Sequence, residues 1–166
     1  GSDPSSEVLD EKRASGDLRT VLQTLDLLLD VNLRQRPVSV SALREEMVSD
    51  LPRVALRELL LNAVMHRNYQ SNSPVHFYWF SDHIRIDNPG GLYGEVSPEN
   101  FSHAVDYRNP IIAEATRVLG YTNRFGQGIA RTLKALELNG NPPPEFSFDP
   151  HWFAVKIRMK DENESK

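Results

Sequence analysis

Three polar side chains recur at every fourth position of one largely apolar segment: Glu58, Asn62 and His66. Four residues advance an α-helix by about 400°, so the three would form a narrow stripe roughly 12 Å long. A carboxylate there could act as a general base toward water, and a carboxamide oxygen one turn later suits Mg²⁺. His66 would bind a ligand or end the helix favourably. The plainer interpretation is a solvated stripe on an amphipathic helix.

A second candidate is the turn Asn88-Pro89-Gly90-Gly91, which directly follows a strand-like segment. Turns of this composition join strands in many proteins, which is the structural interpretation. In the functional interpretation, Gly90 and Gly91 lack side chains and let a flat ring approach the backbone. Asn88, at the strand end, can then hydrogen-bond the amino group of an adenine.

A third candidate is Arg124-Phe125-Gly126-Gln127-Gly128, which places two glycines at an expected helix start. Free N–H groups and the helix dipole favour phosphate at such a position, and Arg124 adds a fork-shaped cation. A lone Gly-x-Gly is equally compatible with an ordinary helix start. The sequence contains no Walker-type phosphate loop, no His-Glu-x-x-His zinc spacing and no Gly-x-Ser-x-Gly nucleophile elbow.

The composition limits the class of protein. A chain of 166 residues favours one domain, and the absence of cysteine excludes disulfides and thiolate zinc sites. The net charge of −4 and the pI of about 5.7 argue against direct binding of duplex DNA. No apolar run is long enough to span a bilayer, and none resembles a signal peptide. We therefore expect a cytoplasmic protein without membrane contact.

Hydrophobic spacing predicts the elements that must position these candidates. The expected helices cover 17–34, 39–48 (a short one), 50–66 with Asp50 and Pro52 at its start, 97–99 (a single turn), 111–119 ended by Gly120, and 128–140. The expected strands cover 75–80, 83–87, 145–148 and 152–160.

Hairpins joined by helices predict an α+β fold: a two-layer α/β sandwich whose mostly antiparallel sheet carries helices on one face. Residues 17–160 would form this domain, with a disordered N-terminal segment at 1–16 and a disordered tail at 161–166. The helix at 17–34 has a broad apolar stripe that suits ordinary packing, with homodimerisation as the alternative.

The order of these motifs resembles the GHKL ATPase superfamily, which includes gyrase B, histidine kinases, ninety-kilodalton heat-shock chaperones and MutL. The resemblance implies the Bergerat sandwich, with ATP bound between the helical layer and a lid at residues 92–123. It implies a water-activating base at Glu58 and a magnesium ligand at Asn62. It also implies adenine recognition around Asn88, Gly90 and Gly91, and phosphate binding at Gly126 and Gly128.

Four stretches, 55–69, 88–92, 108–110 and 124–129, look like a narrower family: the ATP-binding C-terminal domain of predicted bacterial transcriptional regulators. Those proteins often carry an AlbA-type, Schlafen-related domain, and some are labelled helicase-like. The resemblance implies DNA contact only through neighbouring domains. The chain departs from the superfamily at Asn88, where aspartate is typical and Asp87 is adjacent, and in having only two phosphate-loop glycines.

The function expected on this basis is an ATP-binding regulatory domain that uses Mg²⁺, with slow hydrolysis through Glu58 if turnover occurs. Four further residues would support the edge of the site or its charge: His66, Arg67, Arg108 and Arg124. The alternative is a degenerate GHKL fold that serves as a non-catalytic protein-interaction or dimerisation module.

Overall fold

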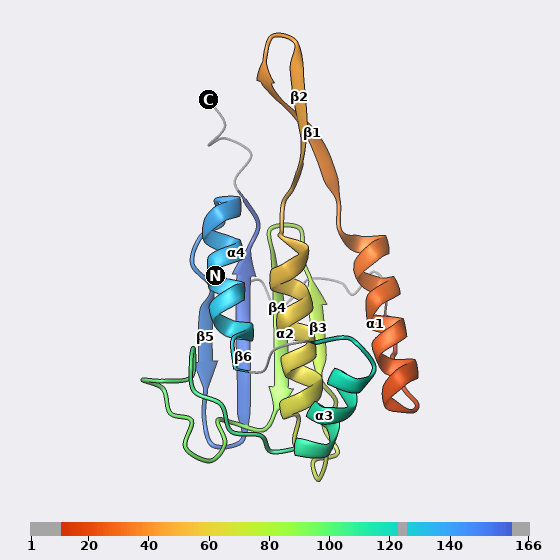
Figure 1. Ribbon diagram of the computed structural model, residues 1–166, viewed down its shortest axis with the longest axis vertical. Coiled ribbons are helices and arrows are strands. Elements are labelled where there is room, and N and C mark those ends of the chain that lie inside the picture. The colour runs from red at the N-terminus through yellow and green to blue at the C-terminus, as the bar shows by residue number, and fades with distance from the viewer. Residues whose placement is uncertain (1–10, 123–125, 161–166) are drawn as a thin grey trace.

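The computed structural model describes residues 11–122 and 126–160, and Figure 1 shows its arrangement. Its main sheet has four antiparallel strands in the order β3-β4-β6-β5. The strands are β3 (His76–Trp79), β4 (His83–Pro89), β5 (Glu145–Phe148) and β6 (Trp152–Arg158). The two hairpins predicted from alternation are therefore present, and β4 and β6 join them at the centre of the sheet.

Helices form the second layer. They are α1 (Leu18–Asn32), α2 (Arg53–His66), α3 (Pro110–Val118) and α4 (Gly128–Asn139). In Figure 1, α2 and α4 lie over one face of the sheet, with α1 and α3 beside α2. The predicted two-layer α/β sandwich is thus confirmed. No helix in the described part of the chain is long and apolar enough to cross a membrane.

The core lies between α2 and the sheet. Nine of the fourteen residues of α2 are buried, which makes it the central helix rather than a surface one. Its leucines pack against strand side chains such as Ile84, Ile86 and Ile157, and against Leu136 of α4. Because apolar contact fixes α2 against both the sheet and α4, polar side chains on its flank are held in defined positions.

Residues 39–48, predicted to be a short helix, instead belong to a hairpin, and that prediction was wrong. The strands β1 (Gln35–Ser41) and β2 (Arg44–Ser49) pair antiparallel and project from the rest of the fold (Figure 1). The apolar residues Val40, Leu43 and Met47 follow helical spacing, which explains the error. All three are exposed, so the spacing does not reflect a buried face.

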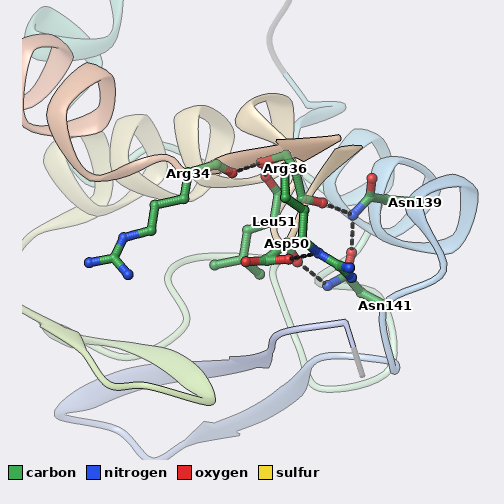
Figure 2. Close-up of polar contacts among 7 residues, drawn as sticks. Arg34, Arg36, Asp50, Leu51, Asn139 and Asn141 are labelled. Atoms are coloured by element: carbon green, nitrogen blue, oxygen red, sulfur yellow. Dashed lines mark hydrogen bonds and ion pairs between the residues drawn. The ribbon is translucent and has the colours of Figure 1, made fainter. Parts of the chain in front are cut away.

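Polar contacts fix the base of this hairpin, as Figure 2 shows. Arg36 pairs with Asp50 at 3.2 Å. Asn139 Nδ2 donates to the Ser49 carbonyl at 2.9 Å, and Asn141 Nδ2 donates to the Asp50 carbonyl at 2.8 Å. Two asparagine side chains at and just beyond the end of α4 therefore bind backbone carbonyls at the base of the hairpin.

Several local predictions need correction. Pro52, not Asp50, is the N-cap of α2, and it makes no side-chain cap because proline has no side-chain acceptor. Asp50 pairs with Arg36 instead. Residues 98–103 form turns without a helix. Asn109, the N-cap residue of α3, makes no side-chain cap there and instead donates from Nδ2 to the carbonyls of Met65 and Arg67 at the end of α2. Residues 1–10 and the tail 161–166 lie outside the described residues.

Candidate functional site

A pocket opens between α2, the end of β4, the start of α4 and the segment 92–107, with about 1010 Å³ of empty space including the part open to solvent. Its lining includes most of the predicted site residues: Glu58, Asn62, His66, Asn88, Gly90, Gly91, Gly126 and Gly128. The three candidate stretches, which are far apart along the chain, therefore meet at one concave surface.

The stripe on α2 forms one wall of this pocket. Glu58 is 4 % exposed, and Asn62 and His66 are partly buried. A solvated stripe is therefore excluded for Glu58. A buried carboxylate requires hydrogen-bond and charge partners, since burial of a bare charge is costly.

Two arginines supply those partners. Arg131 binds Glu58 in a bidentate manner, with Nε 3.0 Å from Oε1 and Nη2 3.1 Å from Oε2. Arg57 donates to Oε1 at 2.9 Å from the same helix. Arg131 lies in the first turn of α4 and lines the pocket. Sequence reasoning missed it, although a basic residue in a first helical turn is a signal because it opposes the helix dipole.

Gly128 is the point at which α4 meets this wall. A Cβ added there would lie 3.1 Å from Glu58 Oε2 and within 3.3 Å of the Asn62 amide. The glycine thus lets the two polar side chains of α2 reach the helix start, where backbone N–H groups are free to bind an anion.

At the end of β4, the side chains of Asn88 and Asp87 lie on opposite faces of the sheet. Ile84, Ile86 and Asn88 are buried on the helix-facing side, whereas Asp87 lies on the other face and pairs with Arg85 at 2.7 Å. Asn88 is 5 % exposed, and its Oδ1 has no hydrogen-bond partner among the described residues. A buried acceptor without a partner costs free energy, so this position favours a donor supplied by a ligand.

The glycines after Asn88 are needed for backbone packing. Gly90 has a φ of 112°, a backbone conformation that residues with a side chain rarely adopt. Its N–H donates to the His151 carbonyl at 2.7 Å. A Cβ on Gly91 would overlap the carbonyl oxygen of Asp149. Gly91 therefore makes room for the β5–β6 turn in addition to lining the pocket.

The imidazole of His66 is held neutral. It is stacked on Tyr107 with ring centroids 5.3 Å apart. Burial, and then the nearby positive charge of Arg108, lowers the pKa of His66 from 6.5 to about 4. At neutral pH this side chain can offer a neutral donor and acceptor to a ligand, but no charge.

The predicted arginines take other positions. Arg67 donates to the carbonyl of Ser73 at 2.9 Å and lies over the Tyr69 ring, outside the pocket lining. Arg108 lies over the Tyr93 ring, 4.8 Å from its centroid, and is also outside the lining. Both therefore order the loops around the pocket. Arg124 lies outside the described residues.

The segment 92–107 covers the pocket, within the region expected to be a lid. Phe101 anchors it in an aromatic cluster on the sheet, 4.9 Å from the Phe146 ring centroid. Val105 reaches the glycine turn, where a Cβ on Gly126 would lie 2.5 Å from its Cγ2. Gly126 also has a φ of 83°, so two independent constraints require glycine there.

No cluster of three or more His, Cys, Asp or Glu side chains that could hold a metal occurs within 11–122 and 126–160. Protein side chains alone do not form a cation cage here. A Mg²⁺ ion at Asn62 would take its other ligands from water and a bound phosphate, as Mg²⁺ commonly does.

Together, these features define a two-layer α/β sandwich with a pocket between its helices and the end of a central strand. Residues 72–157, slightly more than half of the chain, match the family described as "Putative ATP-dependent DNA helicase recG C-terminal". The chain belongs to this ATPase-like family. The matched region contains Asn88, Gly128 and Arg131 but begins after α2, so the place of Glu58 and Asn62 in the pocket rests on geometry.

A solved structure shows the same fold over most of the chain. The DIP2311 protein from Corynebacterium diphtheriae is 26 % identical and superposes with a TM-score of 0.75 over 84 % of this chain. The chain spans only 29 % of that protein's length. The search of curated proteins found no match.

Proposed function

We propose that this domain binds ATP with Mg²⁺ in the pocket between α2, β4 and α4. The observation that carries the proposal is the convergence of three distant segments on one cavity. Glu58 and Asn62 contact the position of Gly128, and Asn88 lines the same pocket. The family match supports a nucleotide as the ligand.

The adenine would lie at the β4 end of the pocket. Asn88 Oδ1 is buried without a partner and can accept a hydrogen bond from the exocyclic amino group of the base. Asp87, which a GHKL-like pattern would also offer for this role, lies on the other face of the sheet. Asn88 is therefore the residue assigned to base recognition.

The phosphates would lie at the start of α4, where Gly128 leaves the backbone accessible and the helix dipole favours negative charge. The Asn62 carboxamide oxygen is the hard donor suited to hold Mg²⁺, which would neutralise charge on the phosphates. Glu58 lies beside them as the candidate base if hydrolysis occurs.

In a longer protein, this domain would act as the nucleotide-responsive part of a bacterial cytoplasmic regulator of the GHKL type. The chain spans less than a third of its solved relative, which is consistent with a module among other domains. Contact with DNA would then be made by the neighbouring domains, since the net charge of −4 does not favour it here.

The test is calorimetric titration with ATP, ADP and GTP, each with and without Mg²⁺. Binding of Mg-ATP by the wild type is expected, and Asn88→Ala should weaken it about tenfold, the size expected for one buried hydrogen bond. Asp87→Ala is the matched control, because this neighbour faces away from the pocket and should leave affinity unchanged. A wild type that binds none of the three nucleotides would refute the proposal and favour the non-catalytic interaction module.

A further inference from the structure

We propose that Arg131 is a polyphosphate-binding residue of this pocket, and that Glu58 holds it until a nucleotide enters. The inference rests on the proposed ATP site and adds a residue and a charge exchange to it. The family match includes Arg131, but the contact that defines its role is made with α2, which lies outside the matched region.

The first observation is the geometry of the pair. Nε and Nη2 of Arg131 donate to the two oxygens of Glu58 at 3.0 and 3.1 Å, two parallel bonds of the fork-on-carboxylate type. The same planar fork fits two oxygens of a phosphate equally well. A residue in this arrangement is therefore already shaped for phosphate.

The second observation is the position of Arg131 in α4. It lies three residues after Gly128, in a first turn that contains no acidic residue. A cation is unfavourable at a helix N-terminus, so an anion is required from elsewhere. Glu58 on α2 supplies it in the empty protein, and a nucleotide phosphate at the same helix start would supply it in the loaded one.

The third observation is the balance of charge around Glu58. This one carboxylate, 4 % exposed, is contacted by both Arg57 and Arg131. An arriving triphosphate carries several negative charges and lies next to Glu58, which it repels. Transfer of Arg131 to the phosphates relieves this repulsion, while Arg57 continues to balance Glu58.

This exchange makes the hydrogen bonds that the Glu58 carboxylate accepts depend on whether a nucleotide is bound. In the empty pocket, both of its oxygens accept hydrogen bonds from arginine. Once Arg131 turns to the phosphates, Oε2 loses its arginine donor and becomes available. Arg131 thereby makes nucleotides with longer phosphate chains bind more tightly.

The experiment is a double-mutant cycle read by calorimetric affinity for Mg-ATP and AMP. Arg131→Gln should weaken Mg-ATP about tenfold or more while changing AMP little, because AMP lacks the distal phosphates. Glu58→Gln releases the arginine and should tighten Mg-ATP about tenfold. The gain should be smaller when both substitutions are combined, because no arginine is then released and only the repulsion between Glu58 and the phosphates is removed.

Two further variants keep the result interpretable. Lys134→Gln is the matched control, since Lys134 is a cation of the same helix that pairs with Glu137 and does not line the pocket, and it should leave the ATP-to-AMP affinity ratio unchanged. Arg131→Lys retains the charge and should recover part of the ATP affinity if Arg131→Gln folds poorly. If wild-type protein binds Mg-ATP but the cycle is additive, the exchange is refuted and the ATP site stands. If wild type binds no nucleotide, both fail.

Discussion

Two glycine-bearing turns border the pocket, and they differ in what their glycines contact. At Asn88–Gly91, the missing side chain of Gly91 leaves room for backbone, the carbonyl oxygen of Asp149. At Gly126–Gly128, the missing side chain of Gly128 leaves room for the polar ends of Glu58 and Asn62. Backbone cannot yield without disturbing the sheet, whereas long side chains can shift. Gly91 therefore supports the fold, whereas Gly128 makes room for two side chains of the site.

This difference teaches that glycine motifs of similar appearance have different consequences. In the sequence, both turns suggest close approach of a ligand to the backbone. In the structure, Asn88 and the start of α4 present polar groups toward the pocket, whereas Gly91 packs against backbone. The following four predictions test the contrast, beginning with the one expected to affect stability most.

Gly91→Ala should be the most destabilising change, by about 3 kcal/mol, because its Cβ would overlap backbone of the β5–β6 turn. Urea unfolding monitored by circular dichroism measures this. Gly120→Ala is the control: nothing lies within 4 Å of its added Cβ, and only the φ of 82° opposes alanine, which costs about 1 kcal/mol. Equal losses for the two variants would remove the distinction between backbone packing and local strain.

Acid should lower the stability of the protein through His66. The folded pKa of His66 is about 4 and its ordinary value is 6.5, so the unfolded chain takes up the proton first. The stability from the neutral imidazole is complete above about pH 6.5 and declines as the pH falls toward about 4, by up to about 3 kcal/mol.

The measurement is the free energy of unfolding at about pH 7.5 and about pH 5, for wild type and for His66→Phe, which keeps a ring against Tyr107. The variant should lose less stability than wild type on acidification. Parallel slopes would mean that His66 titrates normally in the folded protein.

Gly128→Ala should change stability by no more than about 1 kcal/mol, because gained helix propensity offsets the contact with Glu58 and Asn62. Its affinity for Mg-ATP should nevertheless fall about tenfold, since those two side chains must move from their positions. Thermal melts with and without Mg-ATP measure both quantities. A large loss of stability here would place this turn in the same class as Gly91.

Leu43→Ser, at the tip of the projecting hairpin, provides a reference far from both turns. Its side chain is 100 % exposed, so the free energy of unfolding should change by less than about 0.5 kcal/mol. A clear loss, together with a change in sedimentation, would show that the tip packs against a second copy in solution.

Much of this architecture could be predicted because its signals are local. The burial of α2 follows from its apolar periodicity, and the burial of Ile84 and Ile86 follows from strand alternation. The β1–β2 hairpin could not be predicted in this way, since Val40, Leu43 and Met47 imitate helical spacing around a turn without glycine.

The candidate site was predictable to a similar extent. Glu58, Asn62, Asn88 and Gly128 were identified from short motifs and do line one pocket. Arg131 was missed because its partner is 73 residues away, and such a pairing depends on how two helices pack. Asn88 could be separated from Asp87 only when the register of β4 was known.

The hydrogen bonds at the base of the β1–β2 hairpin connect that hairpin to α4. One end of this helix opens onto the pocket at Gly128, and beyond the other end Asn139 and Asn141 bind the backbone of Ser49 and Asp50. Twelve helical residues span about 18 Å. A helix of this length is stiff, so its placement is set jointly by the contacts beside the pocket and by those at the base of the hairpin.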